Sequence, residues 1–471
     1  MSKIFWSVFV RVLCVASLVI VGLGFVAVRP AMAQTGYVVE DLGALAGDHG
    51  SVAWAINARG DVVGWSVGQN GTRAFLYTDA GGMVALPGLP DRPRTVARDI
   101  NDAGDIVGTA NAGGVDLGHA VLWGNGGSVQ DLGTLATGAY SEAWGVNNLG
   151  QVVGWSYING GSLGVHGFLY TQGAGLVDLT PNSNTGYALD INDAGQVTGY
   201  KTAFGGFYHA FRWSGGTFVD LGVLPGFADS FGWAINASGQ VTGSSSSSTG
   251  NSERLFRFTD GGGLQDLGGV GEHNVALGIN ASGQVVGSRG RSLKRALLYT
   301  DAAGLQDLNT LIDPSLGWVV LAAHDISDAG LIAGYAANSF TGQTHAVRLR
   351  PTTTPPPACS FQCLRSTSIL LRGWLGRRTY SIKGSVRIDD ESGTPVPAAL
   401  VLARWTQPDG SQRDQYASSD STGVTAFATQ GPSGTYTLTI VNIQLSQYTF
   451  DPTNSVLRKS ITVGTRASSV P

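Results

Sequence analysis

The sequence predicts an all-β protein: a seven-bladed β-propeller closed by its N-terminal strand and followed by a small β-sandwich. A hairpin pattern, Ile-Asn-x-x-Gly-x-Val-x-Gly, recurs seven times, and its last glycine returns every 44 to 47 residues. After residue 34 no stretch shows the amphipathic pattern of a long helix. A repeat of this length built from strands alone is typical of propellers.

Each copy of the pattern indicates a strand end, a tight turn and a second strand. In the fourth copy, Asn192 suits the first turn position because its side chain bonds the backbone two residues on. Gly195 then supplies the positive φ that closes the hairpin. The copies start at Ile56-Asn57, Ile100-Asn101, Val146-Asn147, Ile191-Asn192, Ile235-Asn236, Ile279-Asn280 and Ile326-Ser327.

Two further strand signals accompany each hairpin: a short aromatic segment such as Ala210–Trp213, and an Asp-Leu-Gly type segment such as Asp220–Gly222. Each unit therefore supplies about four strands, which cannot bury both sheet faces alone and must stack on neighbours. The chain starts with an Asp-Leu-Gly segment at 41–43 and its repeats end on an aromatic-type strand at 346–349. We expect the first segment to complete the last blade and remove two free sheet edges.

These repeats resemble the HAF family of extracellular repeat proteins. The resemblance is clearest at His209-Ala210-Phe211-Arg212-Trp213 and covers residues 37 to about 350. It implies secretion and repeats, and it implies no defined activity.

The N-terminal 33 residues read as a secretory signal. Lys3 and Arg11 precede an apolar run at 12–28, and Ala31-Met32-Ala33 fits a cleavage site before Gln34. The alternative is an uncleaved membrane anchor, because the run is long for a signal core. Either alternative places the remainder outside the cytoplasm, in a secreted, cell-surface or periplasmic location, and after cleavage no membrane span is expected.

Residues 34–350 are assigned to the propeller, 351–378 to a Pro/Thr-rich linker with a cysteine pair, and 379–471 to a β-sandwich. In the linker, Cys359 and Cys363 predict a disulfide because the chain is secreted. In the last region, β-rich runs such as Tyr380–Ile388 and Tyr436–Ile443 alternate with turn-forming residues. This region is similar to Ig-like and carboxypeptidase-regulatory-type modules, which implies an accessory role.

A basic or imidazole side chain precedes the aromatic strand in every unit. As a ligand site, these side chains would form a ring of donors for an anion or a sugar. As structural groups, each would pair with the Asp of an Asp-Leu segment, and the unit with Ala85 in place of Asp would then lack a partner. Equal spacing favours the structural interpretation. The residues are Arg73, His119, His166, His209, Arg254, Arg295 and His345.

Other motifs have simpler explanations than chemistry. Gly64-Trp65-Ser66-Val67-Gly68 matches a nucleophile elbow but lies on a hairpin arm, without the strand-turn-helix that the elbow requires. The run 99–105 places four oxygen side chains together, yet turn chemistry explains them without calcium. The tryptophans of the hairpin strands are expected mainly to pack between blades, although a few could stack on sugars. They are Trp54, Trp65, Trp144, Trp155 and Trp233.

The sequence supports two functional hypotheses. The first is a secreted, monomeric, non-catalytic binding scaffold for a glycan or an extracellular protein, without metal or other cofactor. Charged residues make up only 13% of the chain and the propeller region is acidic, which argues against nucleic acid. The second is an extracellular polysaccharide hydrolase or lyase, with a site drawn from Glu142, Asp229, Glu253, Glu272 and His273.

Overall fold

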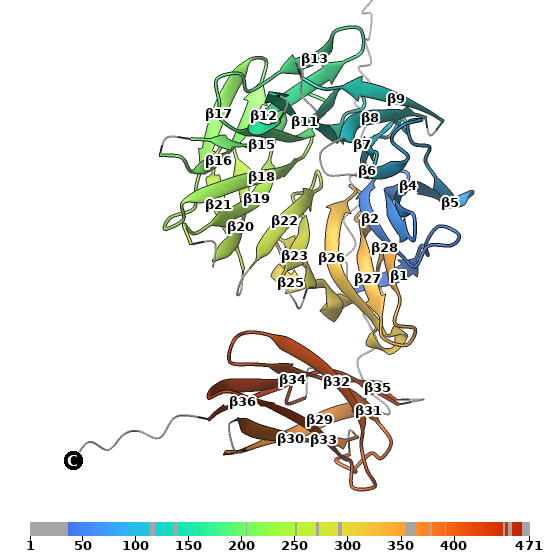
Figure 1. The fold of residues 1–471 in the computed structure, drawn as a ribbon, viewed down its shortest axis with the longest axis vertical. Helices are drawn as coiled ribbons and strands as arrows, with labels where there is room; N and C mark the ends of the chain where they lie inside the picture. Colours follow the sequence, from blue (N-terminus) through green and yellow to red (C-terminus); the bar gives the residue numbers. More distant parts are fainter. Residues whose placement is uncertain are drawn as a thin grey trace, which may run out of the picture.

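The computed structural model shows an all-β chain (Figure 1). It describes residues 36–113, 118–125, 127–135, 140–159, 161–203, 205–249, 252–269, 273–290, 294–353, 363–375, 379–390, 392–445, 448–450 and 455–463. Across these ranges no helix is long and apolar enough to cross a membrane. The signal segment, together with Cys359, lies outside the described residues, and so does the side chain of Cys363.

The repeat region is built from units of four strands that meet in the order of the chain. The first strands are β2 (Gly50–Ile56), β6 (Arg94–Ile100), β10 (Ser141–Val146), β14 (Gly186–Ile191), β18 (Asp229–Ile235), β22 (Asn274–Ile279) and β26 (Trp318–Ile326). The second strands are β3 (Val62–Gly68), β7 (Ile106–Asn111), β11 (Val152–Asn159), β15 (Val197–Thr202), β19 (Val241–Ser246), β23 (Val285–Arg289) and β27 (Ile332–Asn338).

The aromatic segments form the third strands: β4 (Gly71–Thr78), β8 (Gly118–Gly124), β12 (Gly161–Thr171), β16 (Tyr208–Ser214), β20 (Glu253–Thr259), β24 (Arg295–Thr300) and β28 (Thr344–Thr352). The outer strands are β5 (Gly82–Ala85), β9 (Ser128–Gly133), β13 (Gly175–Asp178), β17 (Thr217–Gly222), β21 (Gly263–Gly268), β25 (Gly304–Asp307) and β1 (Gly36–Asp41). We number the units one to seven by their first strands.

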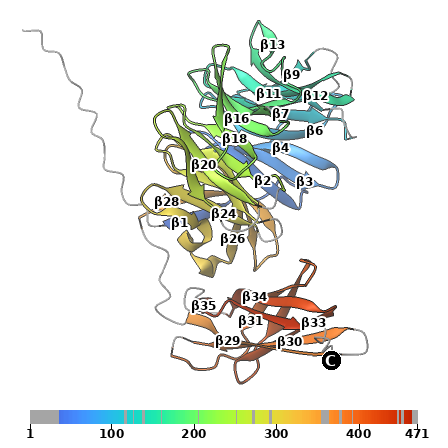
Figure 2. The same cartoon turned by 90° about the vertical axis from the view of Figure 1, so that its left-hand side faces the viewer.

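The sheets stand around a common centre, which is the arrangement of a β-propeller (Figures 1 and 2). Units two to six are separate four-stranded sheets, and within each of them neighbouring strands run antiparallel. Units one and seven share one path of hydrogen-bonded strands, through a single parallel bridge between Gly50 and Thr344. The N-terminal strand β1 pairs antiparallel with β28 over its whole length, from Gly36–Thr352 to Asp41–Val347.

A bulge in the first strand explains the last glycine of each hairpin. In the fourth unit the register shifts between Ala188 and Asp190, so the carbonyl of Tyr187 turns towards Gly199. A Cβ on Gly199 would clash with that carbonyl oxygen, and the same clash would occur at the equivalent glycine of every unit. The recurring glycine therefore reflects close approach of two backbones.

The turn of each hairpin behaves as the sequence predicts and also joins neighbouring units. Gly195 has φ +70° and its N–H donates to the carbonyl of Asn192. The amide of Asn192 donates to the carbonyl of Asn236 in the next unit at 3.0 Å. The same bond links Asn57 to Asn101, Asn101 to Asn147, Asn147 to Asn192, Asn236 to Asn280 and Asn280 to Ser327. In the seventh unit Ser327 takes the place of asparagine and has no amide with which to continue the series.

The C-terminal part forms two four-stranded sheets (Figure 1), as expected for a sandwich. One contains β33 (Val424–Gly431), β30 (Tyr380–Asp389), β29 (Cys363–Leu375) and β35 (Thr449–Phe450). The other contains β32 (Gln412–Ser418), β31 (Leu400–Thr406), β34 (Gly434–Gln444) and β36 (Arg458–Val463). A buried core with Trp405 and Tyr436 fills the space between them.

The assignment of residues 351–378 to a linker was wrong at two places. Residues 351 and 352 continue β28, and Cys363–Leu375 forms β29, which pairs with β30. The sequence hides β29 because Arg365, Arg372 and Gly373 interrupt its apolar residues. The strand is nevertheless anchored by Leu364 and Ile369, which are buried in the sandwich core.

The asparagine series leads to a paired prediction on stability. Asn192→Ser removes the buried amide that bonds Asn236, and should lower the free energy of unfolding by about 1–3 kcal/mol. Ser327→Asn should raise it by about 1 kcal/mol, because we expect the new amide to bond the carbonyl of Asn57 and so extend the series to unit one. Urea unfolding of both variants checks this. An unchanged midpoint in both would show that the series has no energetic role.

Candidate functional site

The ring of basic and imidazole side chains serves mainly to bond strands of the same sheet to one another. Six of its members contact the Asp of an outer strand in their own unit. The pairs are His119–Asp131 (2.9 Å), His166–Asp178 (2.6 Å), His209–Asp220 (2.9 Å), Arg254–Asp266 (2.9 Å), Arg295–Asp307 (4.0 Å) and His345–Asp41 (2.9 Å). These pairs confirm the structural interpretation of the pattern. A role in ligand binding stays a prediction.

Arg73 is the expected exception. Its unit carries Ala85 in place of Asp, and Arg73 instead contacts Asp48 at 3.0 Å and donates to the carbonyl of Ala46. The missing carboxylate is thus replaced by one from the loop before the unit. His345 reaches Asp41 across the β1–β28 pairing, so this pair connects the two ends of the repeat region.

The hairpin strands also carry a continuous series of aromatic rings, which we call the aromatic belt. Neighbouring rings lie 4.3–6.4 Å apart between centroids, in stacked, tilted and edge-on contacts. All members except the buried His324 are half-buried, so part of each ring is accessible. The belt comprises Trp54, Trp65, Tyr140, Trp144, Trp155, Tyr157, Tyr187, Tyr200, Tyr208, Phe231, Trp233, His324 and Tyr335.

The belt agrees with the expectation that the hairpin tryptophans pack between units, because Trp54–Trp144, Trp144–Trp233 and Trp155–Tyr187 are contacts between different units. All five are half-buried and contact other belt rings, whereas the fully buried tryptophans are Trp123 and Trp405. The belt is also uneven. At the position after the hairpin glycine, units three and four carry Trp155 and Tyr200, whereas units five and six carry serine. This unevenness is the feature that a binding site introduces into a symmetric scaffold.

Arg98 inserts a guanidinium between the belt tryptophans. Its Cζ lies 4.8 Å from the ring centre of Trp54, 5.5 Å from that of Trp65 and 4.4 Å from that of Trp144. Cation–π attraction of this kind stabilises a desolvated cation. Burial nonetheless lowers the pKa of Arg98, against the opposing effect of Glu142 at 3.7 Å.

Glu142 is held by the belt itself. One carboxylate oxygen accepts from the Tyr140 hydroxyl and the other from Trp144 Nε1 at 2.8 Å. Burial, followed by the charge of Glu142, raises the pKa of Tyr140. Together with Arg98, these contacts give the belt a small polar cluster surrounded by aromatic rings.

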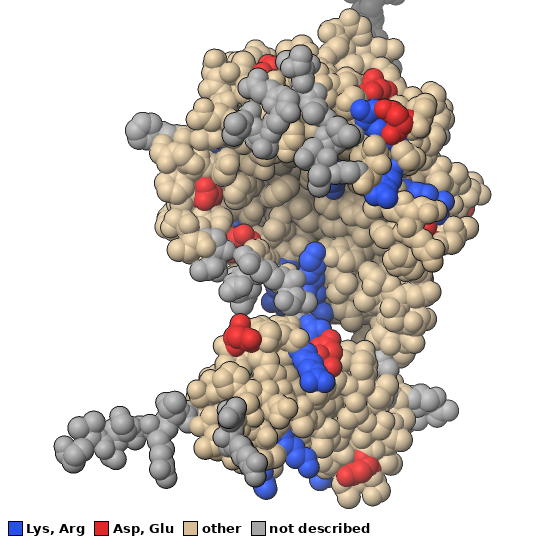
Figure 3. Space-filling view, in the orientation of Figure 1, with Lys and Arg blue, Asp and Glu red and all other residues tan. Residues whose placement is uncertain are grey.

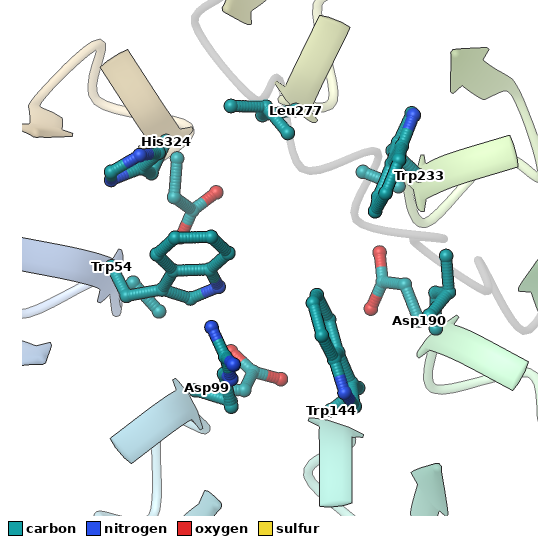
Figure 4. A pocket seen from close by; sticks show the side chains of 12 residues that line it. Trp54, Asp99, Trp144, Asp190, Trp233, Leu277 and His324 are labelled. Carbon is teal, nitrogen blue, oxygen red and sulfur yellow. The ribbon is translucent and has the colours of Figure 1, made fainter. Parts of the chain in front are cut away.

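A cavity of about 90 Å³ lies at the centre, next to the belt (Figure 4). Trp54, Trp144 and Trp233 project into it from three first strands, and the carboxylates of Asp99 and Asp190 lie beside them. Asp325 also lines it. In the view of Figure 3 the ring is hollowed in the middle, and the visible wall is mostly uncharged.

The three aspartates bridge neighbouring units through their backbone. Asp99 accepts from the N–H of Ile100 and of Val146 in the next unit. Asp190 bonds Ile191 and Ile235 in the same way, and Asp325 bonds Ile326 and Ile56. Each carboxylate therefore satisfies donors of two adjacent first strands.

Burial changes the ionisation of this centre. It raises the pKa of Asp99 well above its ordinary value, with a further contribution from the charge of Asp190. It raises the pKa of Asp190 to about 7 and that of Asp325 above its ordinary value. Burial also lowers the pKa of His324 to about 4, although its Nδ1 contacts the Ala53 carbonyl at 2.7 Å.

The remaining sequence motifs have local roles. Ser66 is fully buried, accepts from the Leu45 N–H and donates to the Gly50 carbonyl, so its hydroxyl is occupied. In the 99–105 turn, Asn101 bonds Asp105 and the next unit. Across the part of the chain that the structure describes, no group of three or more His, Cys, Asp and Glu side chains could hold a metal ion.

The catalytic candidates are not gathered into one site. Glu142 belongs to the belt, and Asp229 accepts from the Tyr208 N–H. Glu253 and His273 lie 3.7 Å apart, and Glu272 lies outside the described residues. The sequence analysis missed Arg98 and the bridging role of the three aspartates. One signal in the sequence points to them: the two residues before each Ile-Asn differ from unit to unit, whereas the residues on either side repeat.

The bridging aspartates lead to a prediction on pH. Because the folded pKa of Asp190 lies above its ordinary value of 3.8, the native state binds more protons than the unfolded state between pH 4 and 7. Stability from this group is therefore present at low pH and is lost as pH rises towards 7. Asp190→Asn loses one hydrogen bond to a backbone N–H, so at low pH it should be less stable than the native protein. Because the variant has no carboxyl group to titrate, this difference in the free energy of unfolding should shrink by on the order of 3 kcal/mol by pH 8.

Urea unfolding from pH 4 to pH 8 measures this difference. His324 contributes the opposite slope, but it is present in both proteins and cancels. Asn192→Ser is the control because it loses a buried bond without losing a titrating group. A constant gap between Asp190→Asn and the native protein would contradict the assignment.

Comparison with known proteins gives similarity at the level of fold. No family model and no curated protein matches the chain. Among solved structures it is similar to virginiamycin B lyase from Staphylococcus aureus, with 12% identity and TM-score 0.45 over 67% of this chain and 100% of that one. It is also similar to TolB from Acinetobacter baumannii (12%, 0.38, 65% of each chain). A third similar structure is dipeptidyl peptidase 4 from Porphyromonas gingivalis (10%, 0.34, 75% and 59%).

Proposed function

We propose that this chain is a seven-bladed propeller, closed by its own N-terminal strand, that binds glycan on the aromatic belt without performing chemistry on it. The pairing of β1 with β28 and the contact of His345 with Asp41 support closure. The bond from the Ile56 N–H to Asp325 supports it from the centre, because it joins the first unit to the seventh.

The observation that carries the binding function is the continuity of the belt. A scaffold that needed its aromatic residues only for packing would bury them, as it buries Trp123. Instead, the rings of units three to five are only partly buried and lie next to each other. Flat, partly exposed rings offer stacking surfaces for the apolar faces of sugars, and ligand sites typically combine such surfaces with few polar groups.

The polar groups of the belt suit recognition better than catalysis. Both oxygens of Glu142 are occupied by Tyr140 and Trp144, and the Arg98 guanidinium is enclosed by tryptophans. A carboxylate with both oxygens engaged is well placed to orient neighbouring donors. We therefore assign this cluster to holding the Tyr140 and Trp144 rings in place against a bound sugar, and the protein to a secreted or cell-surface binding role.

Glycan binding can be tested on the belt directly. A glycan array identifies the best ligand of the full chain, and isothermal titration then compares variants. Trp155→Ala and Tyr200→Ala should each weaken binding at least tenfold, because each removes a stacking ring, which corresponds to about 1.4 kcal/mol or more.

Trp374→Ala is the matched control, since it removes an exposed tryptophan from the sandwich and should leave binding unchanged. Release of reducing sugar by the native protein would refute the non-catalytic assignment. Retention of full affinity by both belt variants would show that the belt is not the glycan site.

A further inference from the structure

The border between units three and four differs from the borders before units one, three and five. At those three borders a leucine of the connecting loop is buried, and its N–H donates to a buried serine on the second strand of the following unit. The pairs are Leu45–Ser66 (3.1 Å), Leu135–Ser156 (3.0 Å) and Leu224–Ser245 (3.1 Å). Leucine and serine together fill the space between the sheets.

The fourth unit has neither member of this pair. Its loop reads Thr180-Pro181-Asn182, and Lys201 stands on β15 where units one, three and five have serine. The change is compensated elsewhere. Thr180 Oγ1 accepts from the Gly167 N–H at 3.0 Å, a role that serine plays in other units, and a Cβ on Gly186 would crowd that hydroxyl. The departure is thus a coordinated set of substitutions.

The consequence is a pocket of about 380 Å³ between the two sheets. This volume falls in the range of about 300–1,000 Å³ that small-molecule sites occupy. Its walls include Lys201, Trp213 and Phe218 from unit four, and Val177 and Asn182 from unit three and the loop. Lys201, Trp213 and Phe218 are each half-buried.

Two hydrogen-bond donors of this pocket have no acceptor among the described residues. Lys201 Nζ lies 5.2 Å from the ring centre of Phe218, and no carboxylate contacts it. Three other units carry a bonded aromatic residue at the position of Trp213: Trp123 Nε1 donates to the Pro87 carbonyl, Tyr170 accepts from Gln130 and Tyr299 accepts from Gln265. Opposite Trp213 the corresponding residue is Val177, which is 51% exposed and cannot form such a bond.

One carboxylate lines the pocket and is already engaged. Asp178 Oδ2 contacts His166 Nδ1 at 2.6 Å, and Oδ1 accepts from the Thr180 N–H at 2.8 Å. Lys201 therefore remains the charged group without a counter-ion. A cation, an indole N–H and two aromatic faces together match an acceptor-rich anion on a six-membered ring.

We propose that this pocket is a second binding site, separate from the belt, for a carboxylate carried on a six-membered ring. Lys201 binds the carboxylate, Trp213 donates its indole N–H, and the Trp213 and Phe218 rings contact the ring of the ligand. A sugar acid and an aromatic acid share this chemistry, and matched neutral compounds separate the two sources.

Isothermal titration and ligand-observed NMR with the full chain test the proposal. Glucuronate is compared with glucose, and benzoate with benzamide, at low ionic strength. We expect the acid of at least one pair to bind tenfold or more tightly than its neutral partner, and that pair identifies the source. Equal binding within both pairs would overturn the proposal.

Variants of Lys201 test whether the preference for the acid arises in this pocket. Lys201→Ser introduces the residue that units one, three and five carry, so the fold should tolerate it, and the preference should fall to within about twofold. Lys201→Arg should retain it. Lys383→Ser is the control, because Lys383 is an exposed lysine on β30 of the sandwich and belongs neither to this pocket nor to the belt.

The belt variant Trp155→Ala separates this proposal from the belt assignment. It should keep the acid preference while losing glycan affinity, whereas Lys201→Ser should do the reverse. An acid preference that survives Lys201→Ser, or one that disappears with Trp155→Ala, would place the anion outside this pocket.

Discussion

The crowding of backbone at the centre is the constraint on which the rest of the fold depends. First strands of neighbouring units lie close together at the centre, and their buried N–H and C=O groups need hydrogen-bond partners. The chain solves this at two levels. Asparagine amides join carbonyls of successive turns, and aspartate carboxylates join N–H groups of successive first strands. Neighbouring sheets share almost no backbone hydrogen bonds, so these side chains connect them.

At the carboxylate level, each of three aspartates serves two units. Each aspartate serves its own unit and the next, so Asp99 covers units two and three, Asp190 covers four and five, and Asp325 covers seven and one. Unit six is left over and carries Gly278 at this position, where a Cβ would crowd the backbone of Asp325. One carboxylate for each pair of units also keeps the number of buried acids low. Because each of the three has a raised pKa, a buried carboxylate in every unit would be far more costly.

Features that repeat could be predicted from the sequence, because repetition averages out local ambiguity. The turn at each asparagine, the strand order and the pairs between basic side chains and outer-strand aspartates all came from patterns shared by many copies. Even the exception at Arg73 was visible, since Ala85 broke the pattern. Features without a repeat were missed. The strand β29 has no periodic apolar pattern, and the continuity of the belt across units depends on how sheets converge, which no single unit encodes.

Strand β15 shows how one unit can carry both departures without losing its scaffold. Successive residues of a strand face opposite sides of the sheet, so Tyr200 and Lys201 serve different surfaces although they are adjacent in sequence. Tyr200 contacts Tyr187 and Phe231 of the belt, whereas Lys201 contacts Phe218 at the border with unit three. Between the strands, Gly199 keeps the close backbone approach that every unit shares. Substitution on either face therefore leaves the hydrogen bonds of the sheet intact, and the two surfaces can diverge independently while the repeat is preserved.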